Sequence, residues 1–131
     1  MTTIRKASQG DEAYVAKTWV ESLVDVGFDW PTANKQVDQL LDDPLTKALI
    51  ACPPNDRRRI LGFVVYAGRT LLYVCVRNQE RRKGIATALL REAGLADATK
   101  PLLYVYDGPS AKWAKTMRPN AVKVSVMEHL Q

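Results

Sequence analysis

Three consecutive cations followed by a glycine form the segment of this sequence best suited to binding an anion. Arg81, Arg82 and Lys83 precede Gly84, and helix-forming residues follow at once from Ile85. A helix that begins here would point several backbone N–H groups in one direction, with the positive end of its dipole behind them. Gly84 would let an anion approach the backbone closely, because it carries no side chain. The segment therefore predicts a site for a phosphorylated ligand.

Two common phosphate-binding motifs do not match this segment. A nucleotide-triphosphate loop has the pattern G-x-x-x-x-G-K-[ST], whereas Lys83 precedes its glycine. A dinucleotide-binding fold needs three closely spaced glycines, and only Gly84 is present here. The residues Arg81 to Ala86 do match the signature [QR]-x-x-G-x-[GA]. In this signature, and in the order of its expected elements, the chain resembles the GCN5-related N-acetyltransferases, the GNAT family.

The resemblance implies a fold and a cofactor. The fold is a mixed α/β sheet with an antiparallel N-terminal meander, two central strands that splay apart, and about four helices. The diphosphate of acetyl-coenzyme A (acetyl-CoA) would be held by Arg81, Arg82, Lys83, Gly84, Ile85, Ala86 and Thr87. Backbone groups of Val74 and Val76 would bind the pantetheine arm or polarise the acetyl carbonyl, although a sheet-core role fits these valines equally well. Strand alternation places Cys75 on the opposite face, where we expect inert packing.

The reaction implied by the resemblance is acetyl transfer to a primary amine of a small molecule or protein, by direct attack. An amine with a pKa of about 10.4 is almost fully protonated at pH 7, so a proton must leave first. The expected strand Thr70–Val76 contains no carboxylate, and the expected helix Ser110–Met117 contains Trp113 but no tyrosine. The chain thus departs from the family's usual base and acid, and water-mediated deprotonation is the default. Tyr106 and Tyr73, on the flanking strands, are our candidates for proton transfer, with sheet packing as the alternative for each.

The elements that must position these residues follow from hydrophobic periodicity. Short apolar runs predict strands at Thr2–Ala7, Ala48–Cys52, Ile60–Tyr66, Thr70–Val76, Pro101–Tyr106 and Ala121–Met127. Spacings of three and four predict helices from Asp11 toward Gly27, from Pro31 toward Asp42, from Gly84 toward Asp97, and over Ser110–Met117. The family's last strand is not expected. We expect a single domain over residues 1–131, and the resemblance implies that acceptor specificity lies at Phe28–Gln36.

Composition narrows the class of protein. The chain has 131 residues, 47% hydrophobic and 25% charged, as is usual for one globular domain. Its 19 Lys and Arg against 14 Asp and Glu give a net charge of +5, which favours a polyanionic ligand. The two cysteines, Cys52 and Cys75, have neither a disulfide-scaffold nor a zinc spacing. No stretch predicts a membrane span or a signal peptide. We expect a cytoplasmic protein without a metal or a membrane partner.

Other functions and partners stay open from the sequence. The chain could be a non-catalytic acyl-CoA-binding module, or a host-interacting or nucleic-acid-binding module that contacts phosphates through Arg57–Arg59 and Arg81–Lys83. Nucleic acid is not favoured, because no aromatic residue interleaves Arg57–Arg59. An uncovered last strand predicts a homodimer. In its brevity the chain also resembles small acetyltransferase-like proteins encoded by bacteriophages.

Overall fold

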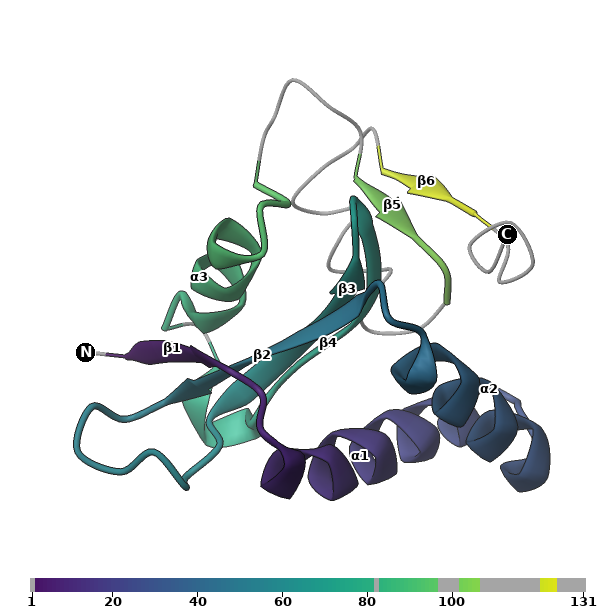
Figure 1. Cartoon of the computed structure of the whole chain (residues 1–131), viewed down its shortest axis with the longest axis horizontal. Coiled ribbons are helices and arrows are strands. Elements are labelled where there is room, and N and C mark those ends of the chain that lie inside the picture. Colours follow the sequence, from purple (N-terminus) through teal and green to yellow (C-terminus); the bar gives the residue numbers. More distant parts are fainter. Residues whose placement is uncertain (1, 82, 97–101, 107–120, 125–131) are drawn as a thin grey trace.

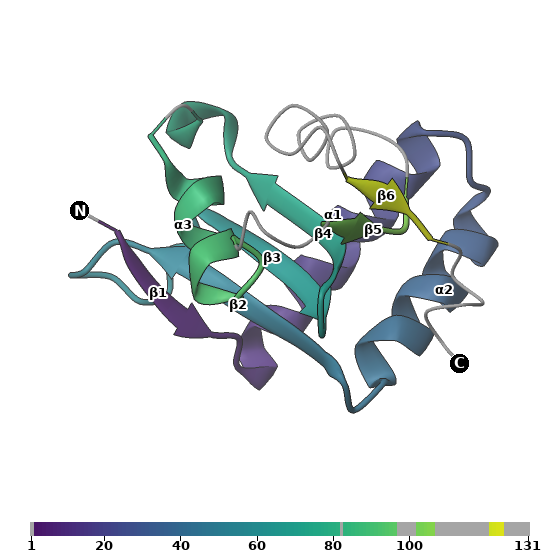
Figure 2. The ribbon, with the colours of Figure 1, turned by 90° about the horizontal axis from the view of Figure 1, so that it is seen from above.

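The computed structural model describes residues 2–81, 83–96, 102–106 and 121–124. These residues form a six-stranded sheet in the order β1-β2-β3-β4-β5-β6, and Figure 2 shows β1 and β6 at its opposite edges. Strands β1 to β4 pair antiparallel, whereas β5 is parallel to β4 and β6 is parallel to β5. The strands are β1 (Thr3–Lys6), β2 (Thr46–Cys52), β3 (Gly62–Ala67), β4 (Thr70–Val76), β5 (Leu103–Tyr104) and β6 (Val122–Lys123).

Three α-helices of the described chain cover the two faces of the sheet. They are α1 (Glu12–Asp25), α2 (Trp30–Asp42) and α3 (Ile85–Glu92). Helices α1 and α2 lie on one face and α3 lies on the other (Figure 1). Each face has its own apolar cluster: Trp19 and Phe63 belong to the first, and Leu71 and Leu89 belong to the second. Strand β4 therefore runs between the two helical layers.

The longest helix packs through the stripe that its sequence predicts. Val15, Trp19 and Leu23 of α1 recur every four residues and are at most 2% exposed. The Trp19 ring lies parallel to the Tyr73 ring of β4, with ring centroids 6.0 Å apart. This stacking fixes α1 against β4. It also sets the direction in which the opposite, polar face of α1 points.

An irregularity in β4 separates this strand from β5. Leu71 pairs with Tyr66 and Tyr73 pairs with Val65, so Leu72 is an extra residue, which defines a β-bulge. A bulge bends its strand and increases its twist. Strand β5 pairs with β4 only at Thr70 and Leu71. The later part of β4 thus leaves β5, which gives the splayed central strands expected from the sequence.

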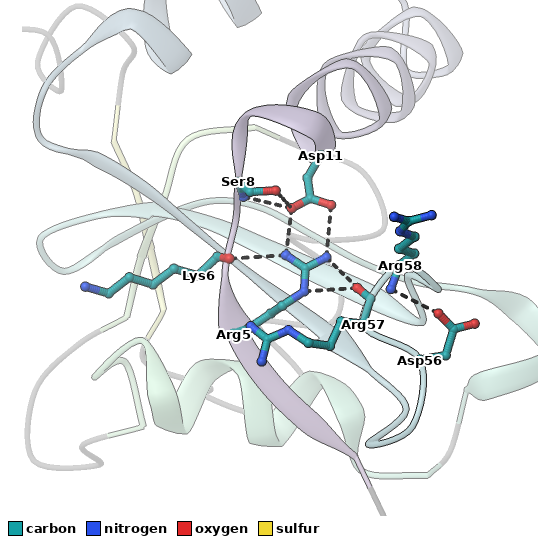
Figure 3. Close-up of polar contacts among 7 residues, drawn as sticks. All are labelled: Arg5, Lys6, Ser8, Asp11, Asp56, Arg57 and Arg58. Carbon is teal, nitrogen blue, oxygen red and sulfur yellow. Dashed lines mark hydrogen bonds and ion pairs between the residues drawn. The ribbon is translucent and has the colours of Figure 1, made fainter.

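A charged clamp joins β1, the start of α1 and the β2–β3 loop (Figure 3). The Arg5 guanidinium donates to both carboxylate oxygens of Asp11, at 2.7 and 3.0 Å. It also donates to the Arg57 carbonyl, from Nη2 at 2.8 Å and from Nε at 3.1 Å. Asp11 accepts two more hydrogen bonds, from the Ser8 backbone amide and from the Ser8 hydroxyl. One arginine thereby sets the positions of α1 and the β2–β3 loop relative to each other.

The clamp predicts acid-dependent stability. The hydrogen bond from Arg5 lowers the pKa of Asp11 well below its usual range. A lowered carboxyl pKa contributes stability that is present above the ordinary value of about 4 and is lost as the pH falls toward the folded-state pKa. We expect Asp11→Asn to lower the free energy of unfolding at pH 7 by about 3 kcal/mol, since it leaves the Arg5 charge partly buried without its partner. Urea unfolding at pH 7 and at pH 3 measures the free energy of unfolding of each protein and its dependence on pH.

The difference in stability between wild type and Asp11→Asn should narrow at pH 3, because the Asp11 carboxyl of the unfolded chain, with its ordinary pKa, is then largely protonated while that of the folded protein stays ionised. The exposed Asp38 of α2 supplies the control, and Asp38→Asn should change stability little at either pH. An Asp11→Asn protein as stable as wild type at pH 7 would contradict the stabilising role of the clamp.

The mixed α/β class expected from the sequence is confirmed, and so are β1 to β4 and the three helices within a few residues. Helix α3 is shorter than expected: it ends at Glu92, and Gly94 follows with φ +77°, a left-handed conformation that ends helices. The expected helix Ser110–Met117 and the end of the expected strand Ala121–Met127 lie outside the described residues.

Candidate functional site

A cavity of about 930 Å³ lies along the part of β4 that β5 leaves. Three elements line it. The polar face of α1 forms one side, residues 73–76 of β4 form the floor, and the loop and first turn of α3 form the other side. This volume is within the range of small-molecule and cofactor sites. The bulge in β4 and the short pairing with β5 are therefore what open the site.

The backbone of β4 turns two residues toward this cavity. The Arg77 N–H donates to the Leu61 carbonyl at 2.9 Å, so Arg77 faces β3. In an antiparallel ladder the residues alternate, which directs the N–H and C=O groups of Val74 and Val76 to the other edge. Arg81 confirms this orientation, since its Nε donates to the Val76 carbonyl at 3.2 Å. This edge of β4 is therefore directed toward the cavity, and its Val76 carbonyl accepts from Arg81.

Close packing of β3 on β4 supports this edge from behind. A Cβ atom on Gly62 would lie 2.7 Å from the Cys75 carbonyl oxygen, so only glycine permits this approach. Val74 and Val76 pack with the α3 cluster, whereas Cys75 packs with the α1 cluster, as strand alternation predicts. Burial raises the pKa of the Cys75 thiol, which disfavours the nucleophilic thiolate.

The start of α3 presents backbone donors to the same cavity. Gly84 precedes the helix with φ +77°, and none of the described side chains caps this helix end. Gly84 and the first three helical residues, Ile85, Ala86 and Thr87, line the cavity. The N–H groups of a first helical turn have no acceptor within their own helix, and the helix dipole makes this end positive. The geometry is suited to holding an anion.

The cations beside Gly84 are partly neutralised from within the chain. Lys83 Nζ donates to Glu80 Oε2 at 2.9 Å, and Arg59 Nη2 lies 3.7 Å from Glu80 Oε1. The hydrogen bond from Lys83 lowers the pKa of Glu80 below its usual value. Glu80 and Arg81 line the cavity, and Arg82 lies outside the described residues. The sequence predicts a phosphorylated ligand for these cations, and Glu80 is an internal partner outside that prediction, although Lys83 follows it by three residues.

A polar stripe of α1 faces the loop across the cavity. Its members recur at the helical spacing of zero, three, four and seven residues: Thr18, Glu21, Ser22 and Asp25. The carboxylates of Glu21 and Asp25 are exposed, so they are available to a cationic ligand. The sequence could have predicted this polar stripe, because it lies beside the buried stripe that contains Trp19 on the same helix. Among the described residues the lining comes from α1 and not from Phe28–Gln36.

The two candidate tyrosines occupy different surroundings. Tyr73 lines the cavity together with Ser22 and Cys75. The Tyr106 hydroxyl donates to Gln36 Oε1 at 2.7 Å, and its ring packs edge-on against Trp19. Burial raises the pKa of both phenols, so both keep their protons at neutral pH. Only Tyr73 of the pair is among the described residues that line the cavity.

Two features of the described residues bear on other classes of site. No group of three or more His, Cys, Asp or Glu side chains in the described segments could hold a metal ion. None of the helices built from described residues combines the length and the apolarity that crossing a bilayer requires.

Solved structures similar to this one are acetyltransferases. A putative acetyl transferase from Pyrococcus furiosus has a TM-score of 0.58 at 20% identity, over 88% of this chain and 91% of that chain. A predicted acetyltransferase from Clostridium acetobutylicum, solved with acetyl-CoA, has a TM-score of 0.57 at 17% identity over 100% of each chain. The chain has the GNAT acetyltransferase fold. A ribosomal-protein-alanine N-acetyltransferase from Brucella melitensis biovar Abortus 2308 has a TM-score of 0.53 at 20% identity, over 72% of this chain and 70% of that chain.

Comparison with known proteins detects the GNAT fold of this chain through structure and not through sequence similarity. No protein-family model matches the sequence, and no curated protein matches it. At 17–20% identity the similar structures establish the architecture alone. The chemistry of the cavity must therefore be argued from the residues of this chain.

Proposed function

We propose that this chain is an N-acetyltransferase of the GNAT family that uses acetyl-CoA and acts on a primary amine. One observation carries the proposal: the donor-rich start of α3 and residues 73–76 of β4 line a single cavity. An anion and an extended chain can therefore bind side by side. Acetyl-CoA joins a diphosphate to an extended pantetheine arm, and a protein of similar fold was solved with it.

The residues of this chain divide the binding of acetyl-CoA between them. The backbone at Gly84 to Thr87, with Arg81 and Lys83, would hold the diphosphate, because charge-assisted hydrogen bonds to an anion are stronger than neutral ones. The N–H of Val76 would donate to the pantetheine arm, since the Val76 carbonyl already accepts from Arg81, and Val74 on the same edge would lie beside the arm. Acetyl-CoA supplies an acetyl thioester, whose transfer to an amine nitrogen breaks the carbon–sulfur bond and releases the free thiol.

Tyr73 is the residue best placed to donate a proton to the leaving group in this reaction. Its phenol lines the cavity and is protonated at neutral pH, since burial raises its pKa. A protonated phenol can donate to the departing sulfur, which then leaves as a thiol. Tyr73 therefore serves as the proton donor in this proposal.

The carboxylates of α1 favour a cationic acceptor. Glu21 and Asp25 lie one turn apart on the side of the cavity opposite the α3 loop. Opposite charges attract a protonated amine to this side, and a carboxylate beside the amine can accept its proton, directly or through water. We therefore propose an acceptor that carries a protonated primary amine at neutral pH.

We expect the double variant Glu21→Gln, Asp25→Asn to raise the KM for a cationic amine about tenfold, as two attractive charges are lost. The dissociation constant of CoA should stay the same, since neither side chain belongs to the α3 side of the cavity. Steady-state kinetics and calorimetry measure the two quantities. Glu12→Gln, at the exposed start of the same helix, serves as the control. An unchanged KM in the double variant would contradict the role of these carboxylates.

Two measurements test the proposed function. Calorimetry at near-physiological salt should give saturable binding of CoA, and acetyl-CoA with a panel of primary amines should release free thiol. Binding without thiol release across the panel would favour a non-catalytic acyl-CoA-binding module. No binding of either form of the carrier, together with salt-dependent binding to DNA or RNA, would favour a nucleic-acid-binding module.

A further inference from the structure

The three arginines of the β2–β3 loop, Arg57–Arg59, lie at two different sites. Arg57 and Arg58 line a separate cleft of about 590 Å³, beside Arg5 and Ser8. Arg59 instead lies next to Glu80, which belongs to the lining of the larger cavity. The loop itself is held by the clamp, because Arg5 donates to the Arg57 carbonyl. One cation of the triplet is thereby placed beside the start of α3.

Glu80 is the common partner of two cations at this end of the cavity. Its side chain is 14% exposed, whereas those of Arg59 and Lys83 are 61% and 60% exposed. The carboxylate is thus packed in place, and the two cations extend over it from different segments. Arg81 lies in the same lining, and its Nε donates to the Val76 carbonyl. This end of the cavity has more positive charge than Glu80 can balance, and a more highly charged anion would bind both cations better.

We propose that Arg59 binds the 3′-phosphate of CoA, taking this group in place of Glu80 when the carrier is bound. The inference rests on the proposed function. In CoA the 3′-phosphate lies beyond the diphosphate, on the far side from the thioester. With the diphosphate at the backbone of Gly84 and Ile85, the next phosphate reaches the rim where Arg59 and Glu80 meet. Arg59 matches this ligand because a planar guanidinium can donate two parallel hydrogen bonds to phosphate oxygens.

The test compares CoA with 3′-dephospho-CoA, which lacks only this phosphate. Wild type should bind CoA more tightly, and Arg59→Ala should reduce the ratio of the two dissociation constants by roughly three- to tenfold, the range for an exposed charged contact. Arg58→Ala removes the same charge from the adjacent residue, which faces the other cleft, and should keep the wild-type ratio. Arg59→Lys should recover part of the preference. Calorimetry with each nucleotide gives all the constants.

Two results would overturn the inference. The first is an unchanged ratio in Arg59→Ala, and the second is an equal loss of preference in Arg58→Ala, which would indicate long-range charge alone. Neither result affects the proposed function, because wild type would still bind CoA. A wild-type protein that binds neither nucleotide would instead refute the proposed function itself.

Discussion

Replacing Gly84 with aspartate is expected to abolish the rise in melting temperature that CoA causes. Gly84 has φ +77°, a region that aspartate tolerates better than most residues, and a Cβ atom there meets nothing within 4 Å. The new carboxylate would lie at the start of α3 and accept the N–H groups that the diphosphate needs. The helix is then capped and the anion is repelled. The variant should therefore fold and fail to bind.

The size of the effect follows from mass action. A ligand at one hundred times its dissociation constant stabilises the folded state by about 2.7 kcal/mol, which raises the melting temperature of a domain of this size on the order of 10 °C. Gly84→Asp should show no rise under the same conditions, measured by thermal unfolding with and without CoA.

Gly68 provides a matched control for this experiment. It also has a positive φ, +57°, and open space around a Cβ atom, but it lies in the turn between β3 and β4, at the opposite end of β4 from the cavity. Gly68→Asp adds the same charge and a similar backbone strain, and should keep the full response to CoA. A Gly84→Asp protein that still responds would contradict the anion site at α3.

Replacing Tyr73 with phenylalanine is expected to lower kcat about a hundredfold, the lower range for the loss of a general acid or base. The ring and its stacking on Trp19 are retained, so only the hydroxyl that faces the cavity is removed. The dissociation constant of CoA should stay the same. Steady-state kinetics at saturating amine, together with calorimetry, separate the two quantities.

Tyr106→Phe is the companion variant. It removes the 2.7 Å hydrogen bond to Gln36 and should lower the free energy of unfolding by about 1 kcal/mol without a comparable change in kcat. Equal losses of kcat in the two variants would contradict the assignment of the proton donor to Tyr73 alone. The pair thus decides between the two tyrosines that the sequence predicts.

Local signals account for the parts of the site that the sequence could predict. The β4 strand, the glycine before α3 and the buried stripe of α1 each depend on residues close together in the chain, so pattern and turn chemistry suffice. The backbone orientation of Val74 and Val76 was implied by the resemblance, and the ladder to β3 now supplies its physical basis.

Long-range contacts account for what the sequence could not supply. Arg59 and Glu80 are 21 residues apart, and only the fold brings them together. Tyr73 and Tyr106 are equivalent in the sequence, because each follows apolar residues in an expected strand. Both belong to the same core cluster, but Tyr73, which follows the bulge at Leu72, also lines the cavity, whereas Tyr106 donates to Gln36. Neither the bulge nor the hydrogen bond to Gln36 can be predicted from the local sequence pattern.

Under the proposed function, the cofactor would be held mainly by peptide backbone: the edge of β4 and the first turn of α3. Such a surface is determined by φ and ψ angles, and it survives replacement of the side chains around it. The side chains around this cavity can therefore change during evolution while Gly84 and the bulge at Leu72 are retained. Chains that share only 17–20% of their residues can keep one architecture in this way. Distant relatives of this protein are therefore better found by comparing backbone structures than by comparing sequences.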